Sequence, residues 1–134
     1  MDHFSHTPPN LTKNQALVMT TLSQADGPLS AYTILDQLRD EGLRAPLQVY
    51  RALDKLVEFG MVHRLESLNA FVPCRHTDSK ANDLVAFTIC ETCGHVAEVT
   101  DGSLDKRLKG VASKSGFELR HSTVELHGVC NDCQ

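Results

Sequence analysis

The chain has 134 residues, a formal net charge of −4 and 41% hydrophobic residues. This length fits one domain or two small ones, and the negative net charge excludes a global basic field that would attract nucleic acid. Residues 1–15 lack the basic segment and apolar run of a signal peptide. No apolar stretch approaches the roughly 20 residues that span a bilayer. We therefore expect a cytoplasmic protein with mostly reduced thiols and no membrane partner.

Three helices are predicted in the first half of the chain. The first spans residues 11–24. The second follows Ser30, which can cap it, and ends at Gly42. The third begins at Pro46, which suits a first helical turn, and ends before Gly60. Their apolar stripes are predicted to be Val18, Met19 and Leu22, then Ala31, Ile34, Leu35 and Leu38, then Val49, Leu53, Leu56 and Val57.

Two short strands, residues 61–67 and 69–74, are predicted after the third helix. Three helices followed by a β-hairpin are typical of a winged helix-turn-helix, which binds DNA through its third helix. Arginine commonly reads guanine edges, and tyrosine can reach phosphate or a thymine methyl group. The candidate DNA-binding residues are Tyr32, Gln48, Tyr50, Arg51 and Lys55. A solvated helix surface would show the same spacing, so that alternative stays open on the pattern alone.

The second half predicts a hinge and a smaller unit. Residues 75–83 are polar and lack periodicity. Beyond them we expect strand, turn and strand, then a helix at 103–115 with Leu104, Leu108, Val111 and Ala112 on its apolar face. A strand at 117–127 follows, with a bulge or burial on both faces because its apolar alternation slips. The predicted class is α+β, with a winged-helix domain at 1–73, a hinge at 74–83 and a small α/β dimerisation domain at 84–134.

Four of the five cysteines form two C-x2-C pairs, Cys90 with Cys93 and Cys130 with Cys133. Two such pairs in one short chain predict a structural zinc site with four thiolate ligands and no open position for catalysis. Gly94 follows the first pair, where a tight turn often needs a positive φ. A redox pair, the main alternative, would open a helix, whereas the flanking segments have the composition of strands. Inert core thiols are the remaining alternative.

This order of elements resembles the ferric uptake regulator (Fur) superfamily of metal-dependent bacterial repressors. The resemblance lies in "SAYTILDQL", "VYRALDKLVEFGMVHR", "FTICETCGHVAEV" and "GFELRHSTVELHGVCNDC". Within the superfamily, "GMVHRLESLNAFVPC" and "HGVCNDC" most resemble the zinc uptake regulator branch. The resemblance implies a homodimer with a structural zinc in each subunit and a second, regulatory zinc where the two domains join. It also implies that the filled regulatory site promotes sequence-specific binding to operator DNA.

The resemblance also implies ligands for the regulatory zinc, which are His63, Cys74 and Glu98. Each has a plainer alternative: a wing histidine facing water, an inert thiol and an exposed strand carboxylate. The family usually has a histidine seven residues before the first cysteine of the knuckle. Asp83 stands at that position here, and His76 is the alternative fourth ligand. The clustered His-x-His of the family's further site is absent, so no third metal site is expected.

The sequence therefore predicts a zinc-responsive repressor of zinc uptake and homeostasis genes. It would act as a homodimer on double-stranded DNA, without enzymatic activity or a small-molecule substrate. An iron- or peroxide-sensing regulator of the same superfamily is the nearest alternative, but those sites favour histidine and carboxylate, whereas Cys74 offers a thiolate. A zinc-ribbon protein or thiol oxidoreductase is less favoured, because no nucleophile and base accompany the thiols.

Overall fold

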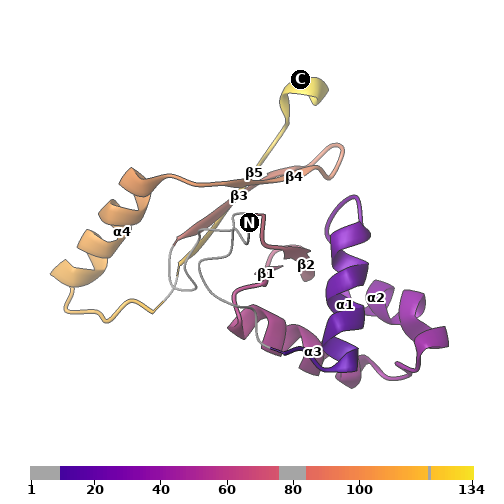
Figure 1. The fold of residues 1–134 in the computed structure, drawn as a ribbon. Helices are drawn as coiled ribbons and strands as arrows, with labels where there is room; N and C mark the ends of the chain where they lie inside the picture. The colour runs from indigo at the N-terminus through magenta and orange to yellow at the C-terminus, as the bar shows by residue number, and fades with distance from the viewer. Residues whose placement is uncertain (1–9, 76–83, 121) are drawn as a thin grey trace, which may run out of the picture. The chain divides into compact units, whose positions relative to one another are not determined.

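The computed structural model describes residues 10–75, 84–120 and 122–134 (Figure 1). The chain divides into two compact units, Met1–Ser79 and Lys80–Gln134. Each unit combines helices with its own sheet, which confirms the α+β class. Among the described residues, no helix has the length and apolar character needed to cross a membrane.

The described part of the first unit is a winged helix. Three helices precede a two-stranded antiparallel hairpin, as the sequence predicts (Figure 1). A short 3-10 helix, η1, extends the second helix. The elements are α1 (Lys13–Gln24), α2 (Ala31–Leu38), η1 (Arg39–Glu41), α3 (Pro46–Glu58), β1 (Val62–Leu65) and β2 (Ala70–Pro73).

Local signals in the sequence fix the helix ends. The backbone N–H of Thr33 donates to Ser30 Oγ at 3.1 Å, so Ser30 caps α2 as predicted. Gly42 has a φ of 105°, which ends η1 in the left-handed region that glycine adopts without strain. Gly60 has a φ of 78° just beyond α3. The predicted stops are therefore confirmed.

The core of the first unit lies between the three helices and the hairpin. Ala52, which the predicted stripe of α3 omitted, is buried. Val57, which that stripe included, is 39% exposed, so this part of the prediction is wrong. Val57 lies at the edge of the apolar face of α3, so its side chain is partly directed toward solvent. The buried residues of this core cluster are Val18, Leu22, Ala31, Ile34, Leu35, Leu38, Leu43, Val49, Ala52, Leu53, Leu56, Val62 and Phe71.

The second unit contains a three-stranded sheet in the order β4-β3-β5 (Figure 1). β4 pairs antiparallel with β3 across a tight turn, and β5 pairs parallel with β3 after a crossover through α4. The sequence predicts this order of elements. They are β3 (Val85–Cys90), β4 (Val96–Val99), α4 (Gly102–Lys114), β5 (Thr123–Gly128) and the short 3-10 helix η2 (Asn131–Cys133).

The last strand begins later than predicted. β5 starts at Thr123, because the chain just after α4 is used to end that helix. Gly116, with a φ of 66°, donates its N–H to Ser113, and Phe117 donates to Ala112 at 2.9 Å. This pattern is a Schellman motif. The N–H of Phe117 is therefore used at the end of the helix and is not available for pairing in the sheet. The pairing of β5 with β3 is continuous and no residue of β5 is buried, so the expected bulge or two-sided burial is also wrong.

Candidate metal centre and nucleic-acid interface

The topology of the second sheet brings the two C-x2-C pairs together. β3 and β5 are parallel, so both strands end at the same edge of the sheet. Cys90, the last residue of β3, lies opposite Gly128, and the Glu91 N–H donates to the Gly128 carbonyl at 2.7 Å. The second pair follows two residues later, with Cys130 immediately before the 3-10 helix η2 and Cys133 at its end. Two motifs 36 residues apart in sequence therefore meet in space.

The four thiols form one cluster. The Sγ atoms of Cys90, Cys93, Cys130 and Cys133 all lie within 4.8 Å of one another. A tetrahedral zinc with bonds of about 2.3 Å to sulfur places any two sulfur atoms about 3.8 Å apart. The Sγ atoms of Cys93 and Cys130 are separated by 3.8 Å. The donor type, number and spacing therefore fit a structural zinc site, and Gly94 adopts the predicted positive φ of 81° in the knuckle.

Backbone N–H groups donate to one thiol of the cluster and stabilise its thiolate form. Those of Cys130, Cys93 and Thr92 point to Cys90 Sγ at 3.3, 3.4 and 3.4 Å. They stabilise the thiolate and lower the pKa of Cys90 to about 5. The Cys133 thiol instead hydrogen bonds to the Cys130 side chain, which raises its pKa to about 12. Without a metal, the four thiols therefore cannot all ionise near neutral pH, and a bound cation would replace the shared protons.

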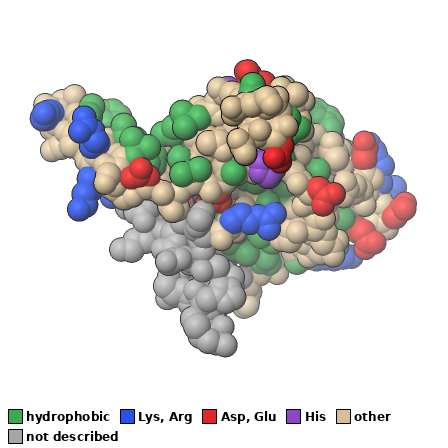
Figure 2. Space-filling model, turned by 90° about the horizontal axis from the view of Figure 1, so that it is seen from above, with side chains coloured by type: hydrophobic (Ala, Val, Ile, Leu, Met, Phe, Trp, Pro, Cys, Tyr) green, Lys and Arg blue, Asp and Glu red, His purple; other side chains and the backbone are tan. Residues whose placement is uncertain are grey.

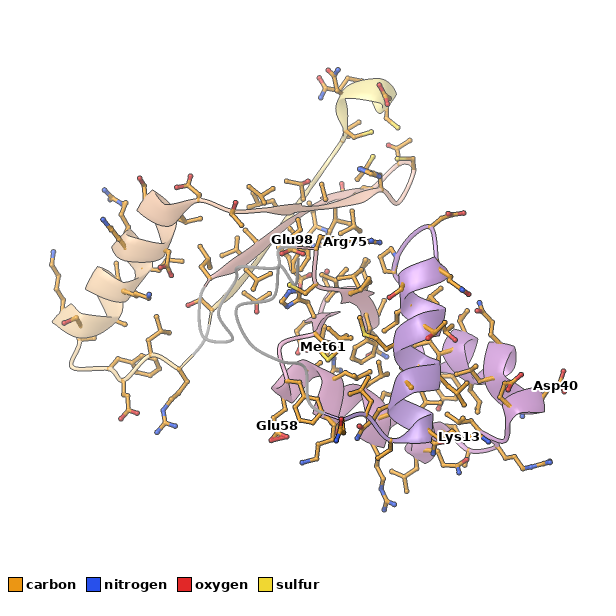
Figure 3. The ribbon with its side chains drawn as sticks, in the orientation of Figure 1. Lys13, Asp40, Glu58, Met61, Arg75 and Glu98 are labelled. Atoms are coloured by element: carbon orange, nitrogen blue, oxygen red, sulfur yellow. The ribbon has the colours of Figure 1, made fainter. Side chains whose placement is uncertain are left out.

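The wing hairpin brings two predicted regulatory ligands together. His63 pairs with Val72 across the hairpin, and the Cys74 N–H donates to the Met61 carbonyl at 2.9 Å. His63 and Cys74 are therefore diagonal neighbours on one face of the hairpin. Their ligand atoms lie within 4.8 Å of each other, and both residues are half-buried. Met61, whose carbonyl accepts this hydrogen bond from Cys74, lies just beyond Glu58, the last residue of α3; both are labelled in Figure 3.

The other regulatory candidates lie elsewhere in the chain. Glu98 is half-buried on β4, opposite Phe87 of β3. Asp83 and His76 lie outside the described residues. Within the first unit, the structure thus places the ligand atoms of His63 and Cys74 close together.

The predicted DNA-binding side chains differ in exposure. Tyr32 on α2 is 60% exposed, and Arg51 and Lys55 on α3 are exposed. Lys55 Nζ contacts Glu58 Oε2 at 3.0 Å, an exposed pair of small energetic value. Tyr50 is half-buried and packs against the core. Arg51 is thus an exposed guanidinium on the outer face of α3, and it is the one arginine in that helix.

Gln48 has a structural task at the start of α3. Its Oε1 accepts hydrogen bonds from the backbone N–H groups of Arg44 at 2.7 Å and Ala45 at 3.1 Å. Both lone pairs of the amide oxygen are therefore used. Periodicity alone placed Gln48 on the DNA-binding face. Ala45 has no side-chain acceptor and so does not complete the S/T-x-x-E/Q signature, which is why the sequence did not indicate this cap.

A groove of 520 Å³ runs between the start of α1 and the outer face of α3. Arg51 and Lys55 line one wall. The other wall includes Thr12, Asn14 and Gln15, which the sequence analysis did not single out. Thr12 and Gln15 form the capping box of α1, so the S/T-x-x-E/Q signature was available in the sequence. The groove shows that the polar face of α3 continues onto α1.

The fold and the site together define a winged-helix protein with a second unit built around a four-thiol metal centre. Residues 9–127 match the sequence model of the ferric uptake regulator family. The chain belongs to the ferric uptake regulator family.

Individual relatives agree with this assignment. The chain is 41% identical to the zinc uptake regulation protein of Escherichia coli (strain K12) over 92% of its own length and 72% of the relative's. It is 32% identical to the zinc uptake regulation protein of Mycobacterium tuberculosis, over 92% of this chain and 93% of the relative. A solved structure of a zinc uptake regulator complexed with zinc and DNA superposes with a TM-score of 0.85 at 41% identity. That match covers 92% of this chain and 83% of the other.

Replacing Cys93 with serine should remove one tightly bound zinc ion per chain, because the four-thiolate set loses a ligand. The melting temperature of the second unit should fall as well. Zinc content after dialysis against a chelator and a thermal melt measure both effects. Cys74→Ser is the matched control, since Cys74 lies outside the four-thiol cluster, and it should retain this zinc. A Cys93→Ser protein with a full complement of tightly bound zinc and an unchanged melt would contradict the assignment.

Proposed function

We propose that this protein is a zinc-responsive, sequence-specific DNA-binding repressor of zinc uptake and homeostasis genes. The observation that carries the proposal is that one chain combines a winged helix with a four-thiol unit. This structure superposes with a TM-score of 0.85 on a zinc uptake regulator complexed with zinc and DNA. Its partner is double-stranded operator DNA, which places its action in the cytoplasm. No catalytic activity is assigned, because four thiolates leave a metal no open position for a substrate.

The proposal includes two zinc ions per subunit with different tasks. Four cysteines of the second unit would hold the structural ion, for which the 3.8 Å sulfur spacing is the support. His63 and Cys74 would hold the regulatory ion together with Glu98 and a fourth ligand. A thiolate beside an imidazole favours zinc over ferrous iron, both by ligand softness and by the Irving–Williams order. This chemistry favours a zinc sensor over an iron or peroxide sensor of the same family.

The regulatory step we propose is a change in how freely the two domains move about residues 74–83. His63 lies on β1 and Cys74 directly follows β2, at the first residue of the hinge, whereas Glu98 lies on β4. Ligands from both domains around one cation would restrict the winged helix, residues 1–73, relative to residues 84–134. Zinc shifts this equilibrium only by its higher affinity for the restricted state. Asp83 and His76 remain the two candidates for the fourth ligand.

We also propose that the protein acts as a homodimer through the second unit. Several large apolar side chains of that unit face solvent, which is unusual for a stable monomer. Figure 2 shows such hydrophobic side chains beside the Lys and Arg side chains of α4, at the left of the view. A two-fold dimer would present two recognition helices to the two halves of a palindromic operator. The exposed residues are Val99, Val111, Phe117, Leu126 and Val129.

The proposed DNA interface is the outer face of α3 with the neighbouring part of α2. Arg51 would contact base edges, and Tyr50 and Lys55 would contact bases or phosphates beside it. Tyr32 would touch the phosphate backbone. Gln48 would contribute by holding the first turn of α3, since its carbonyl oxygen already accepts two backbone hydrogen bonds.

Cys74→Ser should abolish zinc-dependent DNA binding, because serine does not replace a thiolate as a zinc ligand. It should keep the dimer and one zinc per chain, since the four-thiol cluster is untouched. Fluorescence anisotropy of labelled operator, titrated with buffered free zinc and separately with ferrous iron, tests this expectation and the proposed function together. A parent protein that binds no DNA selectively at any zinc concentration would refute the function. A Cys74→Ser protein that responds to zinc like the parent would move the regulatory site elsewhere.

Asp83→Ala and His76→Ala should differ in the same titration. Loss of the true fourth ligand should raise the free zinc needed for half-maximal DNA binding by about 10-fold or more. Loss of the other residue should have little effect, because it would touch neither metal nor DNA. Asp78→Ala is the control for removing a carboxylate from this segment. Equal and normal responses from all three variants would exclude both candidates.

Arg51→Ala should weaken specific operator binding by about 1–3 kcal/mol and leave zinc content and dimerisation unchanged. Arg51→Lys is the matched variant, because it keeps the positive charge but loses the planar pair of donors that fits guanine. It should keep the salt dependence of binding and lose most of the specificity. Binding of operator and random DNA at several salt concentrations measures both properties. Normal operator binding by Arg51→Ala would show that the outer face of α3 is only solvated surface.

A further inference from the structure

A leucine in the first turn of α3 is exposed to solvent. Leu47 follows Pro46, the first residue of the helix, and is 57% exposed. The buried stripe of α3 lies on another face and includes Val49 and Leu53. Leu47 therefore contributes little to the core of the first unit, although a large apolar side chain in water has a free-energy cost. Single exposed leucines are common on protein surfaces, so a role for Leu47 has to be argued from its place on α3.

The start of a recognition helix is the part that reaches base edges in helix-turn-helix proteins. Leu47 and Arg51 are four residues apart, so their side chains are neighbours on one exposed face of α3. Four residues correspond to about 6 Å along a helix axis. Successive base pairs are stacked about 3.4 Å apart. The two side chains would therefore meet bases within about two base pairs of each other.

The neighbouring polar side chain cannot read adenine in the usual way. A glutamine recognises adenine through two hydrogen bonds, one of which needs its amide oxygen to accept from the adenine amino group. The Oε1 of Gln48 already accepts from the N–H groups of Arg44 and Ala45. In the first turn of α3, the amide oxygen of Gln48 is therefore unavailable to a base. The exposed group beside it is the apolar side chain of Leu47. The thymine methyl group is the apolar feature of an A·T pair in the major groove.

We propose that Leu47 is a specificity-determining residue that contacts the C5-methyl group of a thymine in each half-site. The contact lies within about two base pairs of the guanine that Arg51 reads. This inference rests on the proposed function, and it names a feature of the operator that the protein recognises. The methyl group is specific to thymine, so the contact distinguishes thymine from the other bases without a hydrogen bond.

The experiment uses the zinc-loaded, full-length protein and an operator selected from randomised duplex DNA. Each thymine is replaced in turn by deoxyuridine, which removes only the methyl group. Each guanine is replaced in turn by 7-deazaguanine, which removes the N7 acceptor. Parent, Leu47→Ala, Leu47→Met and Val57→Ala are compared. Val57→Ala is the control because Val57 is an exposed apolar residue near the other end of the same helix.

One thymine per half-site should be sensitive in the parent, and its replacement should weaken binding about fourfold, the worth of one buried methyl group. The Leu47→Ala protein should bind the duplex with thymine and the duplex with deoxyuridine at that position equally. Leu47→Met and Val57→Ala should remain sensitive to this replacement. The sensitive thymine should lie near a guanine whose 7-deaza effect disappears in Arg51→Ala. Retained sensitivity in Leu47→Ala, or no sensitive thymine near that guanine, would overturn the inference. In either case the proposed function stands if the parent still binds operator in a zinc-dependent way.

Discussion

The convergence of four thiols at the ends of β3 and β5 is the constraint on which the second unit depends. Among its described residues, those that are buried all lie on β3: Ala86, Phe87, Ile89 and Cys90. The helix α4 contains no buried residue, and β5 has none. Apolar burial on this scale offsets little of the conformational entropy lost on folding. A metal joining the last turn of the chain to β3, together with a second copy over the exposed apolar face, would supply what this core lacks.

The first unit is organised differently, because buried residues from all three helices and the hairpin form its core. The hairpin is tied to that core through Phe71, which exchanges two backbone hydrogen bonds with Leu29 at 2.8 and 3.1 Å. The Met61 N–H donates to the Leu56 carbonyl, and the Met61 carbonyl accepts from Cys74. The end of α3 is therefore connected to the first residue of the proposed hinge, Cys74. Two backbone hydrogen bonds therefore separate Cys74, a proposed zinc ligand, from the last turns of α3.

Electrostatics alone would not account for the proposed DNA binding. The net charge is −4, and Asp54 lies beside Lys55 and near Arg51 in the same groove. Non-specific attraction to phosphate is therefore modest, and recognition has to depend on contacts with base edges. In the proposed dimer, specific binding would depend on the correct spacing of two recognition helices more than on non-specific attraction. This property suits a switch that acts through the placement of domains.

The sequence by itself determined the order of elements, the caps at Ser30 and Gly42, and the pairing of the C-x2-C motifs, because these depend on local residue chemistry and spacing. The tertiary structure decided that parallel pairing of β3 with β5 brings the two motifs to one edge. It also decided that Gln48 caps α3 and that Leu47 faces solvent, since periodicity gives the face of a helix but not the partner of each side chain. The late start of β5 has the same origin: Phe117 has the composition of a strand residue, but its N–H closes the end of α4.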